Sequence, residues 1–344
     1  MRRQWKLALC LAMGFSGWAG PIDFGKQEFE RALAERKLSP RLYQIQLEVS
    51  TDAPESFRIL PGRVTGGDIR GMMYGLLEAA EQIRARGWLV AVKGSPATAI
   101  RGVRLAVQPG DVDKGWFGSR EHWEQLFAML ARSRLNRLNL AFDGGAIVNE
   151  RALGALRLVS QVASGYAVDL AVSIRPETVS GTAGGLKALL AECPAVRSVQ
   201  VQSGRAGAPL DAVVAAVSEA GRRVTLELEP QDLTPAVEVQ AVGVGVPLRI
   251  PVKYGSPVLE ERPGGVELIW QLATVAAAAE PGQWNDPAFV RKTVQDLIRP
   301  GFAGFEIDAP EPPASEASRP FYMLWGRLGY DPKVPGASAP AKPP

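Results

Sequence analysis

The sequence contains few of the residues that form disulfides and ordinary zinc sites. Its 344 residues include two cysteines and one histidine. Cys10 lies in an N-terminal segment that we expect to be removed, which leaves Cys193 as the only thiol. A single thiol cannot form an internal disulfide, and one cysteine with one histidine makes a poor zinc site. We predict a disulfide-free protein without metal or cofactor, in which Cys193 is a buried inert thiol and His122 a surface residue.

An excess of one charge is also missing. The 39 basic and 36 acidic residues are interspersed, with a net charge of +3. Because a nucleic-acid partner usually requires a basic patch or stripe, we expect no nucleic acid to bind. The sequence also has no serine nucleophile elbow, no phosphate-binding glycine loop and no glycine-rich dinucleotide turn.

No hydrophobic run is long enough to cross a bilayer. Arg2, Arg3 and Lys6 precede an apolar run at residues 7–15, and small residues follow at 16–20. This order predicts a signal peptide over residues 1–20 and a secreted or periplasmic protein, with no membrane span after cleavage. An N-terminal membrane anchor is the alternative. Residues 333–344 are mostly Pro, Ala, Ser and Lys and are predicted to be a disordered tail.

Residues 21–95 have the pattern of a small α/β domain. A short helix is predicted over 28–34, and strands over 42–49, 56–60 and 88–92. Residues 65–68 (TGGD) form a predicted turn and N-cap. The long helix that follows has apolar residues at helical spacing from Ile69 to Ile83 and ends at Gly87.

Residues 96–332 alternate strands and helices at the spacing of a (β/α)8 barrel. Strands are predicted over 100–107, 135–142, 168–174, 196–201, 223–228, 247–252, 302–307 and, more weakly, 266–272. The clearest helices are 120–133, 150–164, 184–192, 210–220 and 287–298. Such alternation indicates parallel strands joined by helical crossovers, and eight strands fit a closed barrel. A doubly wound open sheet is the alternative fold.

Several segments resemble alpha-glucuronidases and bacterial beta-N-acetylhexosaminidases. Residues 67–78 (GDIRGMMYGLLE) look like the end of the small domain that precedes the barrel in those enzymes, and residues 99–103 (AIRGV) like the first barrel strand. Residues 119–139 (SREHWEQLFAMLARSRLNRLN) are similar to the first barrel helix and second strand of alpha-glucuronidase-like proteins. Residues 284–291 (WNDPAFVR) and 322–332 (YMLWGRLGYDP) look like late segments of the same group. The resemblance implies a TIM barrel that processes carbohydrate.

The sequence departs from that group at two points. The group usually carries a helical domain after the WGRL-type segment, whereas this sequence ends in the predicted tail. The group's catalytic acid follows the fourth barrel strand, where residues 199–205 read VQVQSGR and contain no carboxylate. The resemblance therefore supports the fold more strongly than the activity.

Carboxylates at the carboxyl ends of the other strands are candidates for acid/base catalysis. Glycoside hydrolysis needs two carboxyl groups that flank the scissile bond, and barrel enzymes carry such groups at these strand ends. We predict Glu229, Glu306 and Asp308 as catalytic residues. Glu227 and Glu229 share one face of their strand, so Glu227 would lie deeper in the lumen or both would point away. The alternative is that these carboxylates only pair with nearby basic groups.

Charged and aromatic side chains at the same strand ends could hold a sugar. Aromatic rings would stack on its apolar faces while charged groups pair with its hydroxyl or carboxylate groups. The predicted substrate-binding residues are Trp116, Asp143, Arg175, Arg205, Lys253, Tyr254 and Trp270.

The sequence thus predicts a secreted glycoside hydrolase-like protein that acts on a glycan by carboxylate acid/base catalysis, and a glycan containing uronic acid is one candidate. The alternative is a non-catalytic glycan-binding barrel that has lost its acid. The absence of a strand-four carboxylate favours the alternative, and the carboxylates at other strand ends oppose it.

Overall fold

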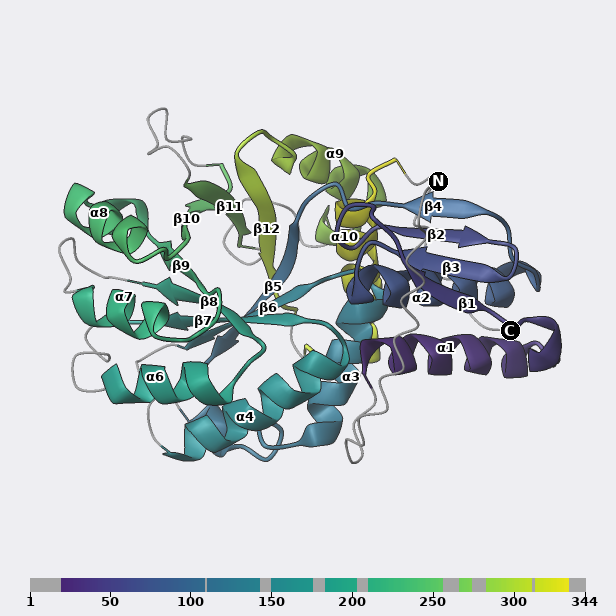
Figure 1. The fold of residues 1–344 in the computed structure, drawn as a ribbon, viewed down its shortest axis with the longest axis horizontal. Helices are drawn as coiled ribbons and strands as arrows, with labels where there is room; N and C mark the ends of the chain where they lie inside the picture. The colour runs from purple at the N-terminus through teal and green to yellow at the C-terminus, as the bar shows by residue number, and fades with distance from the viewer. Residues whose placement is uncertain are drawn as a thin grey trace, which may run out of the picture.

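A computed structural model describes residues 20–108, 110–142, 150–175, 183–202, 210–255, 266–273, 283–310 and 313–333. They form a small α/β unit followed by a closed barrel (Figure 1). The predicted signal peptide and tail fall almost wholly outside these residues, and both stay predictions, as do the predicted domain boundaries. Within the described part, no helix is both long and apolar enough to span a membrane.

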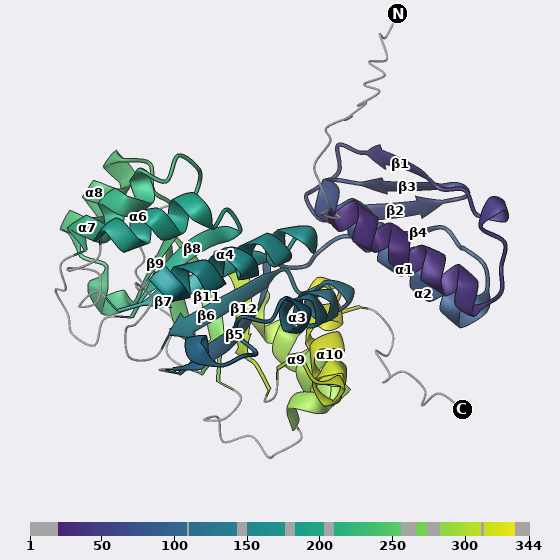
Figure 2. The same ribbon diagram turned by 90° about the horizontal axis from the view of Figure 1, so that it is seen from below.

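The N-terminal unit packs two helices against one face of a four-stranded sheet (Figure 2). Strand β3 pairs parallel with β1 and antiparallel with β2, and β2 pairs antiparallel with β4. The core between the layers contains Phe57, Ile59 and Val64 from the sheet. The elements are α1 (Pro21–Glu35), β1 (Gln46–Val49), β2 (Phe57–Leu60), β3 (Arg63–Gly66), α2 (Ile69–Arg86) and β4 (Val92–Gly94).

Helix α2 begins and ends where the sequence predicts. The Asp68 carboxylate accepts a hydrogen bond from the Gly71 amide at 2.7 Å, and Gly87 ends the helix in the left-handed conformation. Other predictions for this unit were inaccurate. Helix α1 is twice as long as expected. Strand β1 is shorter than the predicted strand 42–49, and β4 begins where the predicted strand 88–92 ends. Strand β3 was missed because its four residues overlap the predicted turn.

The barrel contains all eight predicted strands. Its ring order is β10-β11-β12-β5-β6-β7-β8-β9, with every neighbouring pair parallel, so the open-sheet alternative is wrong. The strands are β5 (Ile100–Val107), β6 (Arg137–Phe142), β7 (Asp169–Ile174), β8 (Val196–Val201), β9 (Thr225–Leu228), β10 (Leu248–Lys253), β11 (Glu267–Leu272) and β12 (Phe302–Asp308).

The helices surround the barrel on its outside (Figure 1). Their apolar faces pack on outward-facing strand residues to form one continuous core. The helices are α3 (Arg120–Arg132), α4 (Glu150–Gly165), α6 (Ala183–Glu192), α7 (Asp211–Ser218), α8 (Pro235–Gly243), α9 (Pro287–Leu297) and α10 (Arg319–Tyr330). Short 3₁₀ helices are η1 (Pro40–Leu42), η2 (Asp111–Asp113), η3 (Pro230–Asp232), η4 (Gln283–Asn285) and η5 (Glu316–Ser318).

Buried polar contacts join the N-terminal unit to the barrel. Glu55 is buried and binds Arg101, at the start of β5, and Arg70 of α2. The amide of Asn136, just before β6, donates to Glu55 Oε1 at 2.8 Å. From the last helix, the Tyr330 hydroxyl donates to the Glu55 carbonyl at 2.7 Å. The N-terminal unit is therefore attached to the amino-terminal ends of the first barrel strands.

Candidate functional site

The barrel lumen is unusually polar. Barrel interiors are generally filled by branched apolar side chains. Here the register places Gln271, Glu306, Gly102 and Arg137 next to one another on successive strands. Because registered partners face the same side of a sheet, these residues share the lumen. A Cβ atom on Gly102 would lie 2.8 Å from Glu306 Cγ, so glycine leaves room for the larger side chains.

Arg137 is the centre of the buried charge network. It donates to Glu227 through two parallel hydrogen bonds of 2.7 and 2.6 Å, and its Nε lies 2.6 Å from Glu306 Oε1. Arg249 also donates to Glu227, at 2.9 Å, and reaches the more exposed Glu267 at 2.8 Å. Of the two placements that the sequence left open for Glu227, the structure has the one deep in the lumen.

Glu306 is almost completely buried below the barrel mouth. Besides Arg137, it is bound by the Asn139 amide, which lies 3.0 Å from Oε2. Asn139 also donates to Gln200 at 2.9 Å and accepts from the Ser173 hydroxyl at 2.9 Å. This predicted catalytic residue is thus held by a hydrogen-bond network from β6, β7 and β8.

The two buried glutamates have opposite pKa shifts. Burial by itself would raise the pKa of Glu227, but the charges and hydrogen bonds of Arg137 and Arg249 lower it to about 2. Burial raises the pKa of Glu306 above the ordinary value of a glutamate. Arg137 offsets only part of that rise, and the Glu227 carboxylate adds to it. Glu306 therefore holds its proton to a higher pH than Glu227 does.

Asp308 lies at the end of β12, one lumen-facing position above Glu306. It pairs in register with Arg104 of β5, and Arg104 Nη1 lies 3.6 Å from Asp308 Oδ1. Both side chains keep more than a quarter of their surface exposed, so this pair is accessible where Glu306 is not. Arg104 Nε is buried and has no hydrogen-bond partner among the described residues.

The opposite wall of the mouth comes from β10 and β11. Lys253 is in register with Gln271, which is in register with Glu306, so both extend into the mouth. Lys253 is exposed, and Gln271 has a buried Nε2 that lacks a partner within the described part of the chain. Arg104 Nε and Gln271 Nε2 are thus buried donors in the upper lumen that have no hydrogen-bond partner among the described residues.

The remaining predicted charged residues lie at other strand ends. Glu229 is half-buried directly after β9 and extends the face on which Glu227 lies. The ring order places β9 three strands from β12, as the sequence predicted. Arg175 is exposed directly after β7. Asp143 and Arg205 lie outside the described residues, so their roles stay predictions.

The predicted aromatic residues differ in location. Trp270 is registered with Phe305, which faces the outer core, and it stacks on Phe302 with ring centroids 4.3 Å apart. It therefore packs outside the lumen. Tyr254 is 41% exposed next to the mouth, with its ring edge on Trp270. Trp116 is half-buried beyond the end of β5, against Phe117.

The two reactive residue types occupy positions outside the lumen. Cys193 is fully buried, and burial raises its pKa to about 12, as expected for an inert thiol. His122 is half-buried on the exterior helix α3 against Trp116 and Trp123, with ring centroids 5.1 and 5.4 Å away, so it is less exposed than a typical surface residue. Among the described residues, no cluster of acidic, histidine or cysteine side chains could hold a metal ion.

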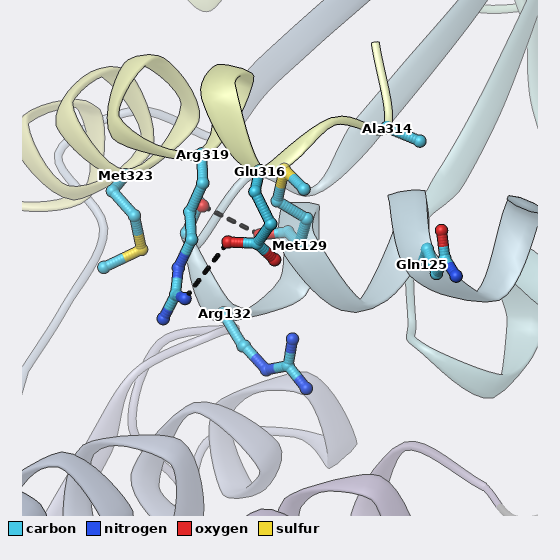
Figure 3. Close-up of a pocket in the computed structure, with 8 residues that line it drawn as sticks. Gln125, Met129, Arg132, Ala314, Glu316, Arg319 and Met323 are labelled. Atoms are coloured by element: carbon cyan, nitrogen blue, oxygen red, sulfur yellow. Dashed lines mark hydrogen bonds and ion pairs between the residues drawn. The ribbon is translucent and has the colours of Figure 1, made fainter. Parts of the chain in front are cut away.

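A cavity of about 290 Å³ lies on the outside of the barrel between α3 and α10. Figure 3 shows Glu316 and Arg319 side by side at the start of α10, with Arg319 Nη1 3.5 Å from Glu316 Oε2. Arg132 points away toward α1, where it binds Glu28 at 2.9 Å. Because its basic groups are paired within the protein, this cavity is a weaker candidate site than the lumen mouth.

Comparisons with known proteins agree with the barrel architecture. No family model and no curated protein matches the sequence. Among solved structures, a GH138 enzyme targeting pectin rhamnogalacturonan II aligns with a TM-score of 0.70 at 15% identity, over 92% of this chain and 63% of that one. A glycoside hydrolase family 20 beta-N-acetylglucosaminidase aligns with a TM-score of 0.55 at 14% identity, over 91% and 89%. The chain therefore has the fold of these glycoside hydrolases, and it spans less than two thirds of the length of the GH138 enzyme.

Proposed function

We propose that the protein acts on a glycan at the carboxyl-terminal mouth of its barrel, as a glycoside hydrolase-like enzyme exported from the cell. The observation that carries this proposal is the accessible Asp308–Arg104 pair above a fully buried polar network. Buried donors that have no partner within the described part of the chain suit a polyhydroxylated ligand, and the fold is that of known glycoside hydrolases.

In this proposal Asp308 and Glu229 are the acid/base pair. They extend from strands three places apart in the ring, so a sugar in the mouth would lie between them. One carboxyl group would protonate the leaving oxygen while the other activates water or attacks the anomeric carbon. Glu306 is too deeply buried to reach the same sugar, which favours a supporting role for it.

The basic residues suggest an acidic sugar as substrate. Arg104 and Lys253 face the mouth from β5 and β10, and Arg175 directly follows β7. Arg104 Nε has no hydrogen-bond partner among the described residues. A uronic acid would place its carboxylate against these groups. This choice agrees with the resemblance to alpha-glucuronidases.

A non-catalytic glycan-binding barrel is the second candidate. It is favoured by the end of β8, because residues 199–205 contain no carboxylate where the alpha-glucuronidase-like group that the sequence resembles carries its acid. Gln200 is already bonded to Asn139 and Ser173, so this strand contributes to the buried network. Such a protein would bind sugars and hydrolyse none.

An activity screen on aryl uronides and aryl hexosaminides tests the proposal. The proteins to compare are wild type, Glu229→Gln and Asp308→Asn, with Glu267→Gln as a charged-residue control outside the mouth. We expect hydrolysis to fall by about 10²-fold or more in the two mouth variants, the usual contribution of a general acid or base, and to be unchanged in the control. Equal hydrolysis by all four proteins would remove both roles, and glycan binding without hydrolysis would establish the second candidate.

A further inference from the structure

One wall of the barrel mouth, on β5, is open to solvent. Arg104 and Ala106 alternate along the strand with residues that are buried in the outer core, so their side chains face the lumen. Arg104 keeps 29% of its side-chain surface exposed, and both Ala106 and the following Gln108 are exposed. The accessible part of the lumen therefore continues along β5 from Arg104 to Gln108.

Arg104, Ala106 and Gln108 form a strip, here called the β5 strip, with a small residue between two polar ones. Residues two apart on a strand lie about 6.6 Å apart on one face, so two such intervals separate the guanidinium from the amide. This spacing leaves room for one sugar ring, with its apolar face on the Ala106 methyl group and its hydroxyl groups near a polar side chain at each end. The backbone N–H of Gln108 donates to the buried Asp111 carboxylate at 2.8 Å, which fixes the upper end of the strip.

The strands beside β5 leave the strip uncovered and place a carboxylate next to it. Ala106 is in register with Ala141 of β6, so at this level neither strand carries a side chain longer than a methyl group. On the other side of β5, Arg104 is in register with Asp308 of β12. A sugar on the β5 strip would therefore lie beside the carboxylate that the proposed function assigns to acid/base catalysis.

We propose that the β5 strip is a sugar-binding subsite beside Asp308, in which the small side chain of Ala106 determines the size of the group that can reach Arg104. Its ligand is one pyranose unit of a glycan, held by the guanidinium at one end and by the Gln108 amide at the other. This inference rests on the proposed function, in which Asp308 contacts the substrate, and it adds a residue that selects the substrate by size. A longer side chain at position 106 would occupy the place of the sugar ring.

Arginine labelling of the full-length protein tests the access to Arg104 without a substrate. Phenylglyoxal reacts with accessible guanidinium groups, and mass spectrometry locates the modified arginine. We expect Ala106→Leu to slow the modification of Arg104 severalfold, because the larger side chain would cover the guanidinium. Ala236→Leu makes the same change at an exposed position of α8 and should leave the rate at Arg104 unchanged. Arg58, which is 49% exposed on the N-terminal sheet, is the internal reference and should react equally in all proteins.

Protection of Arg104 by sugars tests the class of ligand. The probes are methyl glucoside and methyl glucuronide, which share the ring and differ in the group at carbon 6. In wild type at least one of them should slow the modification of Arg104. Binding of that sugar should weaken by about tenfold or more in Ala106→Leu, because the added methylenes occupy the place of the ring. It should weaken by about fivefold in Gln108→Ala, as expected for one lost hydrogen bond.

Equal modification of Arg104 in wild type and Ala106→Leu, or no protection by either sugar, would overturn the proposal. If Ala106→Leu does not fold, Gln108→Trp replaces it, since it covers the strip from its exposed end and should also slow the modification of Arg104. Protection that is lost in Ala106→Leu supports the subsite even if wild type hydrolyses nothing in the activity screen. Hydrolysis by a wild type in which neither sugar protects Arg104 would support the proposed function and overturn the subsite.

Discussion

Arg137 and Glu227 meet inside the barrel through two parallel hydrogen bonds, and neither side chain has appreciable exposure to solvent. Such a pair contributes little net stability compared with apolar packing, but removing one partner leaves the other charge buried and uncompensated. The fold therefore depends on the integrity of the pair.

Glu227→Gln should destabilise the protein by about 3–5 kcal/mol, because Arg137 and Arg249 both lose their shared carboxylate. Urea unfolding followed by circular dichroism measures the change. Glu267→Gln removes a carboxylate that is 57% exposed and binds the same Arg249, so it should cost about 1 kcal/mol or less. Similar losses in the two variants would contradict a special role for the buried pair.

Stability should also depend on pH through Glu227. Its pKa is about 2 in the folded protein, against 4.5 as the ordinary value. The unfolded chain therefore binds this proton more readily, and the stability contributed by Glu227 is complete above about pH 4.5 and is lost as the pH falls toward 2. The loss should be shallower in Glu227→Gln, as measured by urea unfolding between pH 3 and 7. Glu306 acts in the opposite direction because its pKa is raised.

Gly304 fixes the register of β12. Its φ is 149°, and a Cβ atom there would lie 1.9 Å from the Ile100 carbonyl oxygen. Gly304→Ala should therefore destabilise the protein by about 3 kcal/mol, since backbone and strand pairing must both shift. Gly154→Ala, in α4 with no atom near the added methyl, should stabilise by about 0.5–1 kcal/mol. Thermal unfolding of both variants checks the prediction, which fails if the two changes have the same sign.

The two aromatic residues near β10 and β11 should respond differently to truncation. Trp270→Ala should cost about 3–5 kcal/mol, because the ring is buried and stacked on Phe302. Tyr254→Ala should change stability by about 1 kcal/mol or less and should weaken glycan binding if the mouth is the site. Chemical unfolding and a binding titration with the sugar found in the activity screen separate the two effects. A stability loss for Tyr254→Ala as large as for Trp270→Ala would show that Tyr254 is a packing residue.

Local patterns in the sequence were sufficient to predict the barrel. Strands such as β5 and β8 have the predicted boundaries, because apolar residues at every second or third position between amphipathic helices indicate a strand. The alternation around Glu227 put it on one face of its strand with Glu229 but left open whether that face was the lumen. Strand β3 was missed because four residues without an apolar run provide almost no periodicity.

The charge network could not be predicted from strand ends alone. Arg137 begins its strand and meets Glu227 and Glu306 only because the ring closes, and these partners are 90 and more residues away in sequence. Arg104 could have been found, since it alternates with Gly102 and Ala106 on β5. The same alternation shows that Trp270 and Gln271 cannot both face the lumen, so the choice of Trp270 as a mouth residue rested on residue type rather than on direction.

The position of Glu55 has a consequence for how the chain folds during synthesis and for whether the barrel can be expressed without the N-terminal unit. This residue emerges from the ribosome before Arg101 and Asn136, the barrel groups that it binds. The Glu55 carboxylate of the N-terminal unit can therefore be in place to bind the first barrel strands when they are synthesised. A barrel expressed without residues 20–95 would carry Arg101, which is fully enclosed in the intact protein, with its main counter-ion missing. We expect such a fragment to aggregate, and a co-expressed N-terminal unit to restore its solubility.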